Sequence, residues 1–267
     1  MTLICLRRSA LSLCALLLLA ACDDGTWNNP NPPSPEGQLV YQSVMAPAPP
    51  KHLDPALSYA SDESLFISQI YQPPMGYHFL KRPYELIPLG LQDHPQKTFL
   101  DASGNPVEAD STAAAFTRYT LRVRADERYQ PHPAFAVDDN GSPLYLFESA
   151  AAGARYHQIP DFPVTGDRAV HANDYAYQIK RLADPELGSP MLGFMAQYIV
   201  GMKEFTERLG TVERDSWLNL DEIPMEGLEV VDERTLNITI YGRYPQFVYW
   251  LAMHFFSPVA PEVDRFY

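Results

Sequence analysis

The chain has 267 residues, 46% of them hydrophobic, and a formal net charge of -13. This composition is that of a folded protein of one or two domains, and it excludes a disordered or fibrous chain. Because acids outnumber lysine and arginine by 33 to 20, the charge opposes binding to nucleic acid or to anionic lipid, and neither is an expected partner. The 25 prolines predict many turns between short regular elements.

Residues 1–21 have the outline of an export signal. Arg7 and Arg8 precede the apolar run 9–19, which is shorter than the roughly 20 residues of a membrane-spanning helix. The sequence Leu-Ala-Ala-Cys that ends at Cys22 resembles the bacterial lipobox, in which the cysteine is acylated and becomes the first mature residue. An ordinary signal-peptidase site and twin-arginine export are the alternatives.

The residues after this signal predict an anchored, tethered domain. Once residues 1–21 are removed, Cys22 is the one cysteine left, so no internal disulfide is expected. Acyl chains on Cys22 would attach the protein firmly to a membrane. Asp23 resembles the signal that retains Gram-negative lipoproteins at the inner membrane, which places the protein in the periplasm. Residues 22–37 are rich in Pro, Asn and Gly and predict a flexible tether before a folded domain at 38–267.

The first half of the folded region predicts short elements separated by turns. They are a strand at 38–45, a helix from Ser61 to about Tyr71, a hairpin at 100–109, a strand at 118–124 and a hairpin at 135–147. Ser61 is expected to cap the helix, and Pro73 with Pro74 to end it. In the second hairpin, Asp138, Asp139 and Asn140 suggest either a turn or a calcium loop. The turn is favoured because the alternate spacing and distal glutamate of an EF-hand are missing.

The second half predicts a helix, a second and interrupted helix, a hairpin and an aromatic helix. These lie at 171–185, from Ser189-Pro190 to Gly210 with a break near Gly201, at 227–231 with 235–241, and at 245–256. The first of these helices is the clearest, because Tyr175, Ile179 and Leu182 recur at helical spacing. Asn173 or Asp174 is expected to cap it.

No catalytic arrangement of residues is apparent. The sequence has no His-Glu-x-x-His zinc motif, no Gly-x-Ser-x-Gly elbow, and no glycine loop of the kind that holds phosphate. Neither a metal nor any other cofactor is therefore expected. Carboxylates are plentiful, so a glycosidase-type pair of acids stays open.

Three blocks of sequence follow one another in an order found in a known family. The first, LDPALSYASDESLFISQIYQPP, holds Leu53-Asp54-Pro55 and has Gln72 where an acid is usual. The second, RAVHANDYAYQIKRLADP, supplies Val170, Ala172, Asp174, Tyr177 and Arg181. The third begins at Gly227 with GLEVVDERTLNITIY and ends in SPVAPE. Together they resemble the family 5 extracellular solute-binding proteins, the dipeptide, oligopeptide and nickel receptors of ABC importers.

This resemblance implies a mixed α/β fold of the periplasmic-binding-protein-like type II class. Family members have two lobes that close around a ligand, and they are commonly longer than this chain. Residues 38–267 are therefore expected to be the N-terminal part of the solute-binding domain, mostly its first lobe. The second lobe is expected to be missing, which would make the chain an N-terminal fragment.

The resemblance also implies where a ligand binds and what the protein does. First-lobe contacts are expected from the segment that precedes Leu53, namely Ala46, Pro47, Ala48, Pro49, Pro50, Lys51 and His52. Its prolines lack amide donors, which puts the usual strand-like pairing with a ligand in doubt.

The function implied is capture of a peptide or similar small solute by a monomer and its delivery to an ABC permease with ATPase subunits. No reaction is catalysed, and no nucleic acid is bound. Two alternatives stay open. One is a secreted hydrolase that uses paired carboxylates, and the other is a structural or chaperone-like lipoprotein of the envelope.

Overall fold

The computed structural model describes residues 37–40, 49–147, 153–214 and 217–267. The chain divides into two units between Pro49 and Pro50, and the elements below all belong to the second unit. The expectations for residues 1–21, for Cys22 and Asp23, and for Ala46 to Ala48 lie outside the described residues. Of the strand predicted at 38–45, only 38–40 is described, and these three residues are not in a strand.

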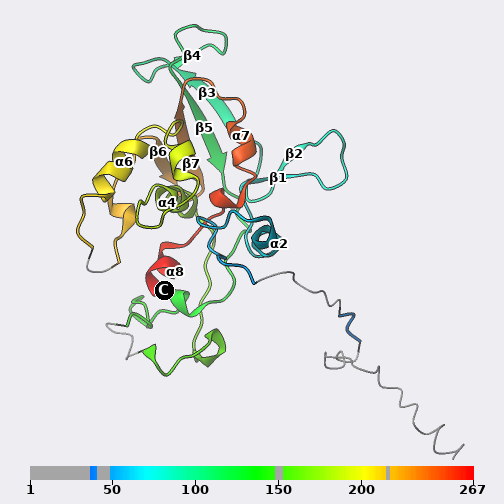
Figure 1. The fold of residues 1–267 in the computed structure, drawn as a ribbon, viewed down its shortest axis with the longest axis vertical. Helices are drawn as coiled ribbons and strands as arrows, with labels where there is room; N and C mark the ends of the chain where they lie inside the picture. The colour runs from blue at the N-terminus through cyan, green and yellow to red at the C-terminus, as the bar shows by residue number, and fades with distance from the viewer. Residues whose placement is uncertain (1–36, 41–48, 148–152, 215–216) are drawn as a thin grey trace, which may run out of the picture. The chain divides into compact units, whose positions relative to one another are not determined.

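An antiparallel five-stranded sheet forms the largest element (Figure 1). In spatial order its strands are β4 (Pro106–Val107), β3 (Gln96–Leu100), β5 (Phe116–Arg122), β7 (Thr235–Tyr241) and β6 (Leu228–Asp232). Burial alternates along β5, where Thr117, Tyr119 and Leu121 are buried, as expected for a strand with one covered face. The sheet confirms the predicted strand at 118–124, the hairpin at 100–109, and the hairpin of 227–231 with 235–241.

Helix α4 (Ala172–Leu182) packs against β6 and β7 and confirms the clearest predicted helix. Tyr175, Ile179 and Leu182 are all buried. The predicted cap was wrong, because the helix begins earlier than expected and His171 holds the cap position. Asp174 instead lies in the first turn, where its carboxylate accepts a hydrogen bond from the N–H of His171 at 2.8 Å.

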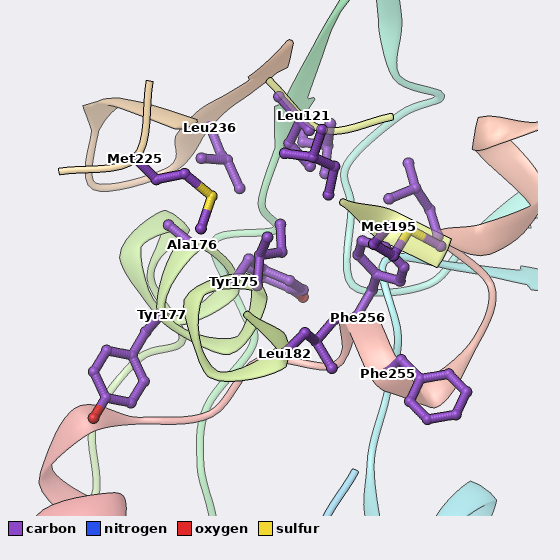
Figure 2. Close-up of a cluster of buried hydrophobic side chains, with 14 of the residues drawn as sticks. Leu121, Tyr175, Ala176, Tyr177, Leu182, Met195, Met225, Leu236, Phe255 and Phe256 are labelled. Carbon is purple, nitrogen blue, oxygen red and sulfur yellow. The ribbon is translucent and has the colours of Figure 1, made fainter. Parts of the chain in front are cut away.

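The hydrophobic core lies between this helix, the sheet and the aromatic segment near the C-terminal end of the chain (Figure 2). Its labelled members are Leu121, Tyr175, Ala176, Tyr177, Leu182, Met195, Met225, Leu236, Phe255 and Phe256. Each fully buried side chain of Leu, Met or Phe type stabilises the fold by about 1.5 to 3 kcal/mol. The core residues extend from Ala56 to Phe256, so residues 50–267 contain the whole of it.

Shorter elements surround the core and the sheet. The helices are α2 (Ser61–Ile70), α5 (Leu192–Met195), α6 (Met202–Leu209), α7 (Phe247–Trp250) and α8 (Pro261–Phe266). Single 3-10 turns are η1 (Pro133–Phe135), η2 (Ile159–Asp161), η3 (Leu220–Glu222) and η4 (His254–Phe256). A separate two-stranded sheet pairs β1 (Met75–Tyr77) with β2 (Leu86–Pro88). Among the described residues, no helix has both the length and the apolar character needed to cross a membrane.

Several boundaries differ from prediction for local physical reasons. The break predicted near Gly201 is confirmed, because this glycine, with a φ of 73°, lies between α5 and α6 and directly precedes α6. The helix expected at 245–256 is a single turn, α7, followed by η4. The cap expected at Ser61 is one residue earlier, at Ala60. The hairpin at 135–147 is reduced to one bridge, between Val137 and Pro143.

The turn of this reduced hairpin is held by Asp138. Its carboxylate accepts hydrogen bonds from the N–H groups of Asn140 and Ser142, both at 2.8 Å. These bonds lower the pKa of Asp138. The carboxylate of Asp138 is thus used to hold the backbone of a turn, as the favoured interpretation of this stretch predicts.

Candidate functional site

The segment Pro50 to Ala60 is tied down by one carboxylate on α2. Oε1 of Glu63 accepts hydrogen bonds from the N–H groups of Lys51 at 3.1 Å and of His52 at 3.0 Å. Its other oxygen, Oε2, accepts from the hydroxyl of Ser58 and from two further N–H groups, those of Tyr59 and Ala60. The five donors converge on a side chain in a residue that is only 3% exposed.

The protonation of Glu63 is set by a balance of burial and hydrogen bonding. Burial alone would raise the pKa of this carboxyl, but the N–H groups of His52 and Ala60 and the hydroxyl of Ser58 stabilise its ionised form. The result is a pKa lowered to about 2. Glu63 is therefore ionised at neutral pH and orients the backbone of this segment.

Arg181 of α4 joins the same segment to α8. Its Nη1 and Nη2 atoms donate to the two carboxylate oxygens of Asp54 at 3.0 and 2.6 Å, and its Nε donates to Asp264 at 2.8 Å. Asp264 also accepts hydrogen bonds from the hydroxyl of Tyr177 at 2.7 Å and from Nε1 of Trp217 at 3.0 Å. We call these residues the Arg181 cluster.

The Arg181 cluster is a mostly buried ion network. Burial would by itself lower the pKa of Arg181, but hydrogen bonding and charge from Asp54, with the charge of Asp264, raise it. For Asp54, burial opposes ionisation, and the hydrogen bond and charge of Arg181 outweigh it, so the pKa of Asp54 is lowered. Both groups therefore carry their charges at neutral pH.

A second arginine, Arg168, forms a similar arrangement at the start of α4. Its guanidinium donates to both oxygens of Asp174, at 2.8 and 2.7 Å, and to both oxygens of Glu262 on α8, also at 2.8 and 2.7 Å. It also lies 5.1 Å from the ring centre of Tyr129. We call this the Arg168 cluster; with the Arg181 cluster it holds α8 at two points.

Two adjoining cavities lie beside these clusters. The first has a volume of about 340 Å³ and is lined by Leu53, Asp54, Pro55, Tyr71, Arg181, Val259, Val263, Asp264 and Tyr267. The second, of about 350 Å³, shares Tyr71 and Val263 with it and extends past Gln72, Glu127 and His132. The cavities thus combine aromatic and aliphatic walls with several polar groups, which suits a small solute with both kinds of surface.

Of the predicted ligand-binding residues, Pro50, Lys51 and His52 directly precede Leu53, which lines the first cavity. Pro50 is half-buried, whereas Pro49, Lys51 and His52 are exposed. The N–H groups of Lys51 and His52 are bound by Glu63, so these two amides are used within the chain.

Sequence reasoning missed the residues that organise the site. Glu63 is the third residue of its helix, but the cap residue is Ala60, so the Ser-x-x-Glu capping signal is absent. Asp264 and Glu262 belong to α8, which was not predicted. Gln72, which lines the second cavity, donates to Glu127 at 2.7 Å. In the described part of the chain, no three His, Cys, Asp or Glu side chains are grouped as metal ligands.

Comparisons with known proteins identify the fold. No protein-family model matches the chain, and no curated protein matches it by sequence. Among solved structures, a periplasmic oligopeptide-binding protein from Borrelia burgdorferi matches 82% of this chain and 31% of its own, with a TM-score of 0.50 and 18% identity. The murein tripeptide binding protein MppA of Escherichia coli matches 79% of this chain and 29% of its own, with a TM-score of 0.47 and 19% identity.

The match to the Borrelia protein shows that the chain has the fold of part of an oligopeptide-binding protein. The expected class, mixed α/β and similar to one part of a type II periplasmic binding protein, is confirmed by this match and by the two sheets. The resemblance inferred from the three sequence blocks is thereby confirmed at the level of the fold. The chain spans about a third of the length of these solved structures.

Proposed function

We propose that the chain is part of a lipid-anchored receptor that captures peptides or similar small solutes for an ABC importer. In this proposal residues 1–21 are the export signal, residues 22–37 are the tether that begins at the acylated Cys22, and residues 38–267 belong to the first lobe. Asp23 would retain the receptor at the inner membrane. The partners are the permease and its ATPase subunits, and the chain itself catalyses no reaction.

The observation that carries this proposal is the fold shared with a periplasmic oligopeptide-binding protein over most of the chain. Two lobes that close on an extended peptide exclude water and hold it largely through main-chain hydrogen bonds, which tolerate many side chains. A receptor of this type needs one lobe with a firmly positioned contact segment. The bonds from Glu63 and Arg181 supply such positioning for Pro50 to Ala60.

The proposed contact surface is the segment Pro50 to His52 together with the two cavities around Tyr71. Asp54 is bound both to Arg181 and to the N–H of Ala56 at 2.8 Å, so this backbone loses little freedom when a ligand binds. Preorganisation of this kind lowers the entropic cost of binding. Tyr71 lines both cavities and is therefore the most informative side chain to change.

Peptide capture is tested with the Cys22→Ser form of residues 22–267 and a mixture of short peptides. We expect the peptides to be recovered chemically intact and to slow amide hydrogen exchange around residues 50–60 and Tyr71. Tyr71→Ala should weaken this protection, while Tyr249→Ala, which changes an exposed tyrosine on α7, should leave it unchanged. Hydrolysis of the peptides would support the carboxylate-dependent hydrolase, and equal protection in Tyr71→Ala and wild type would contradict the proposed contact surface.

The lipid anchor is tested by fractionating Gram-negative cells that express the full chain. We expect wild type in the inner-membrane fraction and Cys22→Ser in the soluble periplasmic fraction. Cys14→Ser is the matched control, because Cys14 lies within the proposed signal, and it should leave the protein at the membrane. Equal distribution of Cys22→Ser and wild type would contradict acylation at Cys22.

A further inference from the structure

The hairpin of β1 and β2 stands apart from the five-stranded sheet. Figure 1 shows it extending away from the sheet, with a loop, residues 78–85, at its tip. Its base is attached to the body of the unit, because the N–H of Met75 donates to the carbonyl of Leu251 at 3.0 Å. The loop is thus presented on a fixed support.

The loop has a defined conformation of its own. Nδ1 of His78 accepts hydrogen bonds from the N–H groups of Leu80 at 3.2 Å and Lys81 at 3.3 Å. The guanidinium of Arg82 donates to the carbonyl of Lys81 at 2.8 Å and lies 4.3 Å from the ring centre of Tyr84. These contacts satisfy backbone groups within the loop and leave its apolar side chains pointing outward.

The outward side chains are unusually apolar for an exposed loop. Phe79 is 87% exposed and Leu80 is 77% exposed, and Tyr77 and Tyr84 beside them are also exposed. Large apolar side chains are ordinarily buried, and an exposed group of them marks a contact with another surface. The rings of Tyr77 and Tyr84, with centroids 6.0 Å apart, form the part of this group nearest to the strands.

The charge of the loop is opposite to that of the chain. Lys81 and Arg82 lie directly beside Phe79 and Leu80, against the single carboxylate of Glu85, which pairs with Lys81 at 2.8 Å. The chain as a whole carries a net charge of -13. A basic, apolar tip on an acidic body is complementary to a surface that is both anionic and apolar.

We propose that this tip docks on an anionic lipid bilayer, with Phe79 and Leu80 inserted at the boundary of headgroups and acyl chains. Lys81 and Arg82 would contact lipid phosphates, and the tyrosine rings would lie at headgroup level, where aromatic rings with polar tips accumulate. The acidic body would be repelled by the same surface, so contact is confined to the tip. This docking involves neither a captured solute nor the acyl group on Cys22.

Vesicle sedimentation tests the proposal directly. Residues 37–267 retain every core residue but lack Cys22 and the apolar run, and they are mixed with phosphatidylcholine vesicles with and without phosphatidylglycerol. We expect binding to the anionic vesicles that weakens as salt is raised. The paired change Phe79→Ser with Leu80→Ser should weaken binding at least about tenfold. Lys81→Glu with Arg82→Glu should weaken it by a similar factor.

Val231→Ser supplies the matched control, since Val231 is an exposed apolar residue on β6. It should bind the vesicles as wild type does. A fluorescence measurement then locates the tip: the emission of Phe79→Trp should shift to shorter wavelength with anionic vesicles and be quenched by brominated lipid, while that of Val231→Trp should not. Wild type that stays in the supernatant, or equal binding by wild type and all variants, would overturn the proposal and would indicate a protein partner for the hairpin.

Discussion

The Arg181 cluster and the Arg168 cluster hold the same helix, α8, but they differ in what else they connect. Arg181 joins α8 to Asp54, so it links three distant parts of the chain. Arg168 joins α8 to Asp174, and Asp174 is only six residues from Arg168 along the chain. The first cluster therefore contributes to the tertiary arrangement of the proposed site, whereas the second mainly braces the start of α4.

The clusters also differ in the exposure of their carboxylates. In the Arg168 cluster the side chain of Asp174 is 1% exposed and that of Glu262 is 41% exposed. In the Arg181 cluster the side chains of Asp54 and Asp264 are 28% and 22% exposed, and Asp264 is further bound by Tyr177 and Trp217. Removal of Arg181 would leave two partly buried carboxylates without their cation, whereas Glu262, the more exposed partner of Arg168, can be rehydrated when Arg168 is removed.

The largest effect is expected from Arg181→Met. The change leaves Asp54 and Asp264 without their common cation, and we expect a loss of about 3 to 5 kcal/mol in the free energy of unfolding. Urea denaturation measures this loss. Arg181→Lys keeps the charge but loses the bidentate geometry, so its free energy of unfolding should lie between those of Arg181→Met and wild type. A loss below about 1 kcal/mol would show that the cluster is not a structural link.

Arg168→Met should come next, with a loss of about 2 kcal/mol. Asp174 would then be a buried carboxylate without its cation, although the N–H of His171 still donates to it, while Glu262 would be rehydrated. The same denaturation experiment compares the two arginines. If Arg168→Met is the more damaging variant, the buried Asp174 matters more than the long-range link through Arg181, and the contrast drawn above is wrong.

Glu63→Gln should alter the dependence of stability on pH. The folded pKa of Glu63, about 2, lies below its ordinary value of 4.5, so its contribution is present above pH 4.5 and lost as the pH falls toward 2. One oxygen of the amide remains to accept hydrogen bonds, so part of the network survives. Thermal unfolding of both proteins between pH 7 and about pH 2 should show the curves converging in acid. Parallel curves would contradict this assignment.

Asp221→Asn should have the smallest effect, and in the opposite direction. Burial raises the pKa of Asp221, and the charges of Asp174 and Glu262 add to the rise against the opposing contributions of Asn173 and Lys180. The ionised form thus destabilises the fold at neutral pH, and stability recovers as the pH falls. We expect a gain of about 0.5 kcal/mol at pH 7 that disappears near pH 3, because partial exposure screens the charge. A loss of stability in Asp221→Asn at pH 7 would contradict the predicted destabilising charge of Asp221.

The elements that the sequence predicted well are those marked by a local pattern of hydrophobic spacing or turn residues. The spacing of Tyr175, Ile179 and Leu182 is that of a helix with a buried face, and α4 has that face. The Asp-Glu-Arg turn between two β-prone runs predicted β6 and β7. By contrast, helix ends depended on which neighbour satisfied the first N–H groups, and this was decided by Glu63 and Asp174 and not by Ser61 or Asn173.

The hairpin of β1 and β2 and the helix α8 could not be predicted for a related reason. The loop between β1 and β2 is a mixture of aromatic and basic residues with no alternating pattern, and its conformation rests on contacts such as Arg82 with Tyr84. Helix α8 has six residues, too few to be stable alone, and is held by Arg168 and Arg181. Neither arginine lies near α8 in the sequence.

What the sequence determined by itself was the pattern of buried faces and the order of three motif blocks. That was enough to predict a mixed α/β fold of the type found in solute-binding proteins. Only the tertiary structure showed that Asp54 and Arg181, which are 127 residues apart, form one ion pair beside a cavity. Hydrophobic periodicity is a local property that can be read along the chain, whereas the pairing of charges depends on which segments the folded core brings together.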